Sequence, residues 1–197
     1  MSIGFYIIRE GRIAVKQTIG NQQLILEVGD ISEKKTNAIV SPVNGRLTGG
    51  GTVDEAILKK AGKGLNEERA NIFKNQLGNE QLPTGQAVIT TGHDLPIEYI
   101  IHARGPVWNG EKKEKQAELA ETYNNCLLLA KEHSVTSIAF PSISTGIYHF
   151  PINLAAKVAL KTVIDFLEKE NFGDVVFTLF SDRSYEVYAN ELRELME

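Results

Sequence analysis

Residues 38–62 read AIVSPVNGRLTGGGTVDEAILKKAG: an apolar run, an irregular loop, three successive glycines, and then a segment with helical periodicity. The run at 38–43 predicts a buried strand, and 53–61 predicts a helix. Glycine lets a ligand come close to the backbone, and the unpaired N–H groups at the start of a helix attract anions. This order therefore predicts a phosphate-binding loop after a strand. Thr52 and Glu55 also fit a capping box, which would explain part of the pattern by helix initiation alone.

A second segment repeats this layout. Residues 138–160 read IAFPSISTGIYHFPINLAAKVAL, which predicts a strand, a loop of small residues and a helix opened by Pro151. Hydroxyl groups and backbone N–H groups of this loop are candidate donors to a phosphate, and open α/β sheets bind ligands at the carboxyl ends of their strands. Two such loops are suited to clamp a diphosphate. The alternative is that both are ordinary loops between a strand and a helix.

Apolar, β-branched runs alternate with helical patterns along most of the chain. The expected strands are 24–28, 38–43, 87–91, 99–103, 137–140 and 175–180. The expected helices are 53–61, 65–77, 115–133, 151–171 and 185–195. Because the strands are almost continuously apolar, helices should cover both faces of the sheet. We therefore expect the α/β class, as a three-layer α/β/α sandwich with a mixed central sheet.

The first residues predict an addition to this sheet. Residues 1–23 have the pattern of a hairpin that turns around Glu10-Gly11 and extends one edge. Neither a linker nor an internal repeat interrupts the sequence. We expect residues 1–197 to form a single domain.

Composition excludes several classes of function. The 197 residues carry 21 basic and 25 acidic side chains, for a formal net charge of −4, so the overall charge does not attract nucleic acid or an anionic membrane. No stretch of 18 apolar residues is present, which speaks against a membrane partner. The single cysteine, Cys126, lies in an apolar-periodic segment and fits a buried thiol in a reducing compartment. We expect a cytoplasmic protein.

Other nucleotide and metal sites fit less well. The glycine pair at 61–65 ends a helix and lacks the Gly-Lys-Ser/Thr ending of a Walker loop, and GGGTVD at 49–54 does not match the dinucleotide fingerprint. The four histidines are scattered without the spacing of metal ligands: His93, His102, His133 and His149. We therefore expect no metal and no cofactor other than the ligand itself.

Taken together, these motifs resemble the macro-domain family from about Leu24 to Leu192. The sequence SPVNGRLTGGGTVD at 41–54 is similar to the family pattern Asn-Ala-Ala-Asn-x-x-Leu-x-Gly-Gly-Gly-Gly-Val-Asp, and Gly29-Asp30-Ile31 matches its first motif. PTGQAVITTGHDLPIEYIIHARGPVW at 83–108 resembles the strand and Ile-His-x-x-Gly-Pro turn of the family, and PSISTGIYHFP at 141–151 resembles its second phosphate loop.

The resemblance implies ADP-ribose as the ligand. By this resemblance Asp30 accepts a hydrogen bond from the adenine amino group, Phe180 stacks on adenine, and Tyr148 lies beside the distal ribose. The ligand-binding residues expected from the motifs are Asp30, Ile31, Gly49, Gly50, Gly51, Thr52, Val53, Ser142, Ser144, Thr145, Gly146, Ile147, Tyr148 and Phe180.

The resemblance also implies a reacting centre formed by Asn44 and Asp54. In relatives the asparagine fixes the distal ribose, and the aspartate helps to position or deprotonate a water. The expected activity is removal of mono-ADP-ribose from acidic side chains of proteins, or deacetylation of O-acetyl-ADP-ribose. Ser41, Thr52 and Leu58 depart from the pattern of hydrolytic relatives, so the alternative is a non-catalytic reader of ADP-ribose or of ADP-ribosylated proteins. A binder of another nucleotide, or of nucleic acid, is a third and weaker reading.

Overall fold

The computed structural model describes residues 3–8 and 12–197. Within these residues, eight strands form one sheet: β1 (Ile3–Ile8), β2 (Arg12–Ile19), β3 (Gln22–Val28), β4 (Ala38–Pro42), β5 (Ala87–Thr91), β6 (Tyr99–Ala103), β7 (Ser137–Phe140) and β8 (Asp174–Leu179). The helices are α1 (Thr52–Ala61), α2 (Lys63–Asn75), α3 (Lys112–Glu132), α4 (Ile152–Leu167) and α5 (Asp182–Met196), and a short 3₁₀ turn, η2 (Ile31–Glu33), follows β3.

The sheet is mixed, in the order β1-β2-β3-β8-β7-β4-β6-β5. The five inner strands from β3 to β6 run parallel, and β1, β2 and β5 pair antiparallel at the two edges. The parallel strands bring the loops after β4 and β7, which are neighbours in the sheet, to the same edge. The register of β4 and β6 also sets Ser41 opposite His102.

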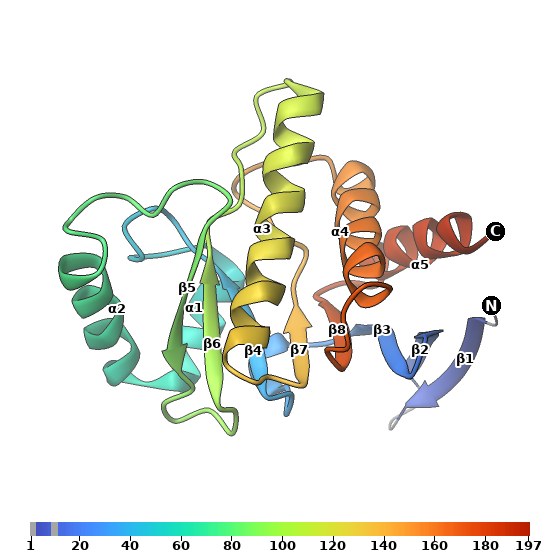
Figure 1. The fold of residues 1–197 in the computed structure, drawn as a ribbon, viewed down its shortest axis with the longest axis horizontal. Helices are drawn as coiled ribbons and strands as arrows, with labels where there is room; N and C mark the ends of the chain where they lie inside the picture. Colours follow the sequence, from blue (N-terminus) through green and yellow to red (C-terminus); the bar gives the residue numbers. More distant parts are fainter. Residues whose placement is uncertain (1–2, 9–11) are drawn as a thin grey trace.

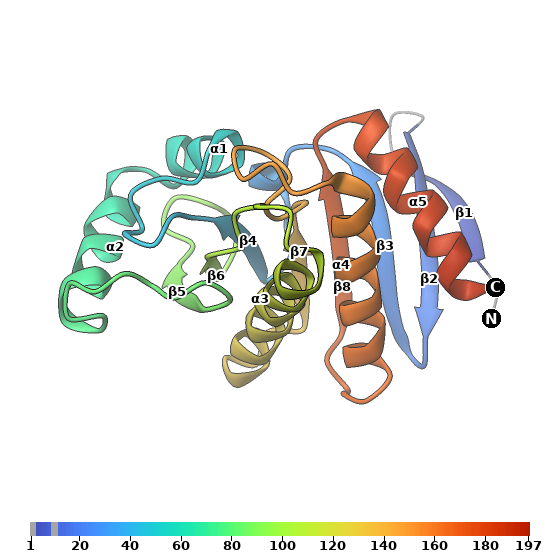
Figure 2. The ribbon, with the colours of Figure 1, turned by 90° about the horizontal axis from the view of Figure 1, so that it is seen from above.

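Helices cover both faces, which confirms the expected α/β/α sandwich. On one face α4 packs between α3 and α5, and Tyr123, Leu160 and Tyr188 from these helices belong to the larger core cluster. On the other face, Ile57 of α1 and Leu65 of α2 pack with apolar side chains of β4 and β6 in a second cluster. Figure 1 shows α3 and α4 side by side in front of the sheet, and Figure 2 shows α1 on the opposite side from α3.

Some local predictions were wrong. Helix α1 begins at Thr52 with Gly51 as its N-cap, and no side chain caps it, so Thr52 and Glu55 do not form the expected capping box. Helix α4 ends at Leu167, four residues before the predicted boundary, and Pro151 is its N-cap. The strands β1 and β2 pair antiparallel at the edge, as the hairpin prediction required, while its turn at Glu10-Gly11 lies outside the described residues.

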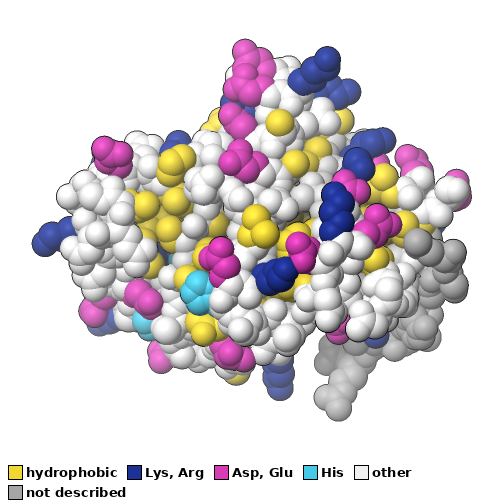
Figure 3. Space-filling model, in the orientation of Figure 1, with side chains coloured by type: hydrophobic (Ala, Val, Ile, Leu, Met, Phe, Trp, Pro, Cys, Tyr) yellow, Lys and Arg dark blue, Asp and Glu magenta, His cyan; other side chains and the backbone are white. Residues whose placement is uncertain are grey.

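On the face seen in Figure 3, acidic and basic side chains are interspersed. Such a surface lacks the single-sign field that attracts a polyanion. Within the described ranges, the model contains no helix with the length and apolar character that a membrane span requires.

Candidate ligand-binding cleft

The first loop, between β4 and α1, is shaped by glycine. A Cβ on Gly50 would lie 1.6 Å from the carbonyl oxygen of Pro42, so only glycine fits there. Gly51 has φ of 85°, in the left-handed region that favours glycine, and its carbonyl accepts the first helical hydrogen bond, from Glu55 N at 2.9 Å. The first amides of α1 therefore lie directly after two residues whose backbone is accessible to a ligand.

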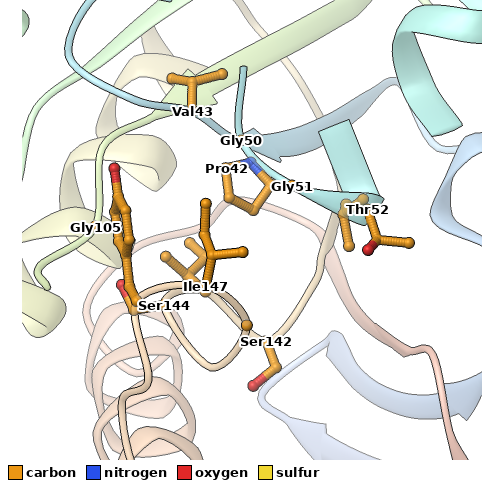
Figure 4. Close-up of a pocket in the computed structure, with 13 residues that line it drawn as sticks. Pro42, Val43, Gly50, Gly51, Thr52, Gly105, Ser142, Ser144 and Ile147 are labelled. Carbon is orange, nitrogen blue, oxygen red and sulfur yellow. The ribbon is translucent and has the colours of Figure 1, made fainter. Parts of the chain in front are cut away.

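The second loop, between β7 and α4, faces the first. Figure 4 shows Ile147 extending from this loop toward Gly50 and Gly51, and a Cβ on Gly51 would lie 3.6 Å from Ile147 Cγ2. Ser144 has φ of 66° and a buried hydroxyl that has no protein partner. Non-glycine residues in the left-handed region of the backbone and unpaired buried hydroxyls are both concentrated at ligand sites.

The two loops border two neighbouring hollows, which together are called the cleft. The first hollow is lined by Pro42, Val43, Gly50, Gly51, Thr52, Val53, Gly105, Ser142, Ile143, Ser144, Gly146, Ile147 and Tyr148. The second is lined by Gly29, Asp30, Ile31, Thr52, Val53, Ala56, Pro141, Ser142, Thr145, Gly146, Thr178, Phe180 and Ser184. Thr52, Val53, Ser142 and Gly146 border both. Of the residues expected to bind ligand, all but Gly49 line this cleft.

The second hollow carries an acidic group and an exposed ring. Asp30 Oδ1 accepts hydrogen bonds from Ser32 N at 2.9 Å and Ser32 Oγ at 2.6 Å, and Oδ2 lies 3.2 Å from Lys60 Nζ. Burial acts to raise the pKa of Asp30, but the bonds from Ser32 and Lys60 outweigh it and hold that pKa below its usual value. Phe180 is 74% exposed, which is unusual for a phenylalanine and leaves its ring free to stack.

Asn44, a predicted catalytic residue, organises its own loop. Its Oδ1 accepts from Arg46 N at 3.0 Å and Thr48 N at 3.1 Å, and its Nδ2 donates to Thr48 Oγ1 at 3.1 Å. Its backbone N–H donates to Gly49 O at 2.7 Å. Asn44 is not among the residues that line either hollow.

Asp54, the other predicted catalytic residue, points into the protein. It is completely buried and does not line the cleft. Its Oδ1 accepts a 2.6 Å hydrogen bond from Ser41 Oγ and forms an ion pair with Nη2 of Arg69, while Oδ2 accepts from Nη1 of Arg69 at 3.2 Å. Arg69 comes from α2 and is 1% exposed. A buried carboxylate of this kind is held in place by a buried counter-charge.

The same network continues to His102 on β6. Nη2 of Arg69 donates to Nδ1 of His102 at 3.0 Å, so that nitrogen carries no proton, and Nε2 of His102 lies 2.9 Å from Thr90 Oγ1 and donates to it. Burial, followed by the charge of Arg69, lowers the pKa of His102 well below its usual value. The ring is therefore neutral at neutral pH.

The chain is similar in sequence to known proteins. A family model described as Macro domain matches residues 40–159. The chain belongs to the macro domain family. A macro domain-containing protein of Caldanaerobacter subterraneus subsp. tengcongensis is 45% identical over 174 residues, which cover 88% of this chain and 98% of that protein. The O-acetyl-ADP-ribose deacetylase of Salmonella typhimurium is 41% identical over 167 residues, covering 84% and 92%.

Solved macrodomains share the whole fold. The Oceanobacillus iheyensis macrodomain with ADP superposes with a TM-score of 0.90 at 44% identity, covering 93% of this chain and 96% of that one. A mutant of the same macrodomain was solved with ADPR. The resemblance inferred from the sequence is thereby confirmed.

Sequence reasoning missed part of the lining of this macro domain. Gly105 lies in the Gly-Pro turn and lines the first hollow, and its position directly after β6 is the signal that could have found it. Thr178 and Ser184 come from β8 and α5, whose local pattern gave no sign of a ligand. Within the described part of the chain, no three His, Cys, Asp or Glu side chains gather as a metal site would require.

Proposed function

We propose that this macro domain binds ADP-ribose along the cleft. Adenine occupies the hollow with Asp30 and Phe180, the diphosphate lies between Gly51 and the second loop, and the distal ribose lies toward Tyr148. The observation that carries this proposal is the pair of neighbouring hollows that share lining residues from α1 and from the second loop. A carboxylate acceptor and a free aromatic ring at one end suit a purine with an exocyclic amino group, and the helix start between the hollows suits phosphates.

The proposed activity is hydrolysis of mono-ADP-ribosyl esters on acidic protein side chains, or deacetylation of O-acetyl-ADP-ribose. The similarity to a relative named O-acetyl-ADP-ribose deacetylase supports it. Asn44 and Asp54 would serve this reaction from behind the lining, Asn44 by fixing its loop and Asp54 by fixing the start of α1. Because both carboxylate oxygens of Asp54 already accept hydrogen bonds, a positioning role is favoured over proton abstraction.

The lining of the first hollow favours a second candidate function. A cleft whose lining residues include no carboxylate at the distal-ribose end would suit a reader, which binds ADP-ribose or an ADP-ribosylated protein without turnover. The two candidates share the ligand and differ only in the reaction.

Calorimetric titration with ADP-ribose, followed by a release assay on the same preparation, tests both. The substrates are O-acetyl-ADP-ribose and a protein bearing mono-ADP-ribose on aspartate or glutamate. Binding with release from either substrate supports the hydrolase, and binding without release from both supports the reader. Absence of binding contradicts the ligand assignment.

A variant separates the roles within the hydrolase. Asp54→Asn should lower kcat without weakening ADP-ribose binding, because the residue acts on the geometry of the reacting centre. Equal losses of kcat and affinity would argue that Asp54 only shapes the cleft.

A further inference from the structure

Arg69 carries a charge that the proposed reaction does not explain. It extends from α2 into the interior beneath the first loop, where Asp54 is its only charged partner among the described contacts. Its Nε has no hydrogen-bond partner. The other members of the network are neutral: Ser41 and Thr90 are hydroxyls, and His102 carries no charge at neutral pH.

Asp54 lies where an uncompensated negative charge would oppose an anionic ligand. It is the third residue of α1, in the first turn, whose amides have no acceptor within the helix and whose residues Thr52 and Val53 line the cleft. A Cβ on Gly50, which lines the cleft, would lie 3.0 Å from Asp54 Cβ. Burial makes the field of the carboxylate strong, because little water screens it. A bare carboxylate here would offset the attraction that the start of the helix exerts on a phosphate.

We propose that Arg69 sets the affinity of the cleft for a diphosphate by cancelling the charge of Asp54 at the start of α1. This inference rests on the proposed binding of a diphosphate between the two loops. The ion pair lets the chain keep Asp54 as an internal anchor for α1 without repelling the ligand. Arg69 does not line the cleft, so it acts through the electrostatic field at the start of α1 and not by contact with the ligand.

The test compares charged and uncharged probes on Arg69→Met. ADP-ribose and pyrophosphate carry the negative charge, and adenosine carries none. We expect Arg69→Met to weaken binding of ADP-ribose and pyrophosphate by about tenfold and to leave adenosine binding unchanged. Arg69→Lys keeps the charge and should bind all three probes nearly as the parent does.

Removing the buried partner of an ion pair destabilises a protein, so Arg69→Met needs companions. Asp54→Asn leaves Arg69 as an uncompensated cation and should bind ADP-ribose more tightly than the parent. Adding Arg69→Met to Asp54→Asn removes that cation, and the double variant should return to roughly parental affinity for ADP-ribose. Adenosine binding should stay constant across the series. The comparison of the Asp54→Asn variant with the double variant therefore decides the matter even if Arg69→Met alone does not fold.

Equal weakening of adenosine and ADP-ribose would overturn the inference, because Arg69 would then act on the shape of the cleft. An unchanged ADP-ribose affinity in folded Arg69→Met would also overturn it. The same holds if the double variant and Asp54→Asn bind ADP-ribose equally well. If the parent binds pyrophosphate but not ADP-ribose and the charge effect persists, the proposed function fails and the inference stands. If the parent binds ADP-ribose and the variants show no effect of charge on that binding, only the inference fails. If the parent binds neither ADP-ribose nor pyrophosphate, the inference and the proposed function both fail.

Discussion

The hydroxyl of Tyr188 donates a hydrogen bond to the hydroxyl of Ser142, with 2.9 Å between Oη and Oγ. Tyr188 lies on α5 and is fully buried, whereas Ser142 borders both hollows of the cleft. A second buried ring supports the same loop: Tyr123 Oη accepts from Ile143 N at 3.1 Å and donates to Pro141 O at 3.3 Å. The second loop is therefore fixed from the core beneath it.

Replacing Tyr188 with phenylalanine removes one of these supports. Burial raises the pKa of Tyr188 to about 12, so its hydroxyl stays protonated and remains a donor at ordinary pH. We expect Tyr188→Phe to lower the free energy of unfolding by about 1 kcal/mol and to weaken ADP-ribose binding severalfold, because Ser142 becomes free to rotate. Calorimetry and urea unfolding measure the two effects. Tyr185→Phe, on the same helix but outside the cleft lining, should leave ADP-ribose affinity unchanged, and an equal loss there would contradict the argument.

Asp30→Asn tests the adenine end. Asparagine keeps one oxygen for Ser32 but replaces the other with an amino group, which cannot accept a hydrogen bond from adenine. Since Asp30 is partly exposed, we expect ADP-ribose binding to weaken by about tenfold rather than more. Ribose 5-phosphate lacks adenine and should bind the variant and the parent alike. The matched control is Glu33→Gln, which also loses a contact with Lys60 but lies outside the cleft lining.

The neutral His102 makes stability depend on pH. Its pKa in the folded protein lies well below 6.5, whereas in the unfolded chain it returns to that value. Below pH 6.5 His102 therefore binds a proton in the unfolded chain but stays neutral in the folded protein, so the free energy of unfolding falls as the pH decreases. From pH 7.5 to pH 5.5 this group should remove about 1.4 kcal/mol from the free energy of unfolding.

Urea unfolding at the two pH values measures that loss. His102→Gln abolishes the titration and should show a smaller loss than the parent. His133→Gln, which replaces an exposed histidine outside the Arg69 network, serves as the control variant. A parental loss in the His102 variant would mean that other groups produce the pH dependence.

The first loop could be read from sequence because its signals are local. Apolar run, glycines and helical periodicity follow one another within residues 38–62, and each reports on the backbone around it. Phe180 and Asp30 follow only from the family resemblance, and both line the cleft. The two residues are 150 positions apart in the sequence, and they lie in the same hollow because β3 and β8 pair in the sheet.

The direction of the Asp54 side chain could not be read in this way. It depends on Arg69 and His102, which lie on other elements, and no periodicity links them to the first loop. Arginine on a helix is ordinarily exposed, so the sequence of α2 gave no reason to place Arg69 in the interior. The capping-box prediction at Thr52 failed for a related reason: Gly51 adopts the backbone geometry of the N-cap without a side chain.

Gly50→Ala tests whether the first loop binds the diphosphate through its backbone. The added Cβ would collide with the carbonyl of Pro42 at the end of β4, so the loop has to move away from the sheet. We expect the free energy of unfolding to fall by about 1–3 kcal/mol and ADP-ribose binding to weaken by at least about tenfold. Gly20→Ala provides the control: alanine is strained there by a φ of 62°, but no atom lies near the new Cβ and the residue is outside the cleft. If Gly50→Ala loses stability but keeps its ADP-ribose affinity, binding of the diphosphate does not depend on this loop. The proposed site is supported if Gly50→Ala loses both stability and affinity while Gly20→Ala loses stability alone.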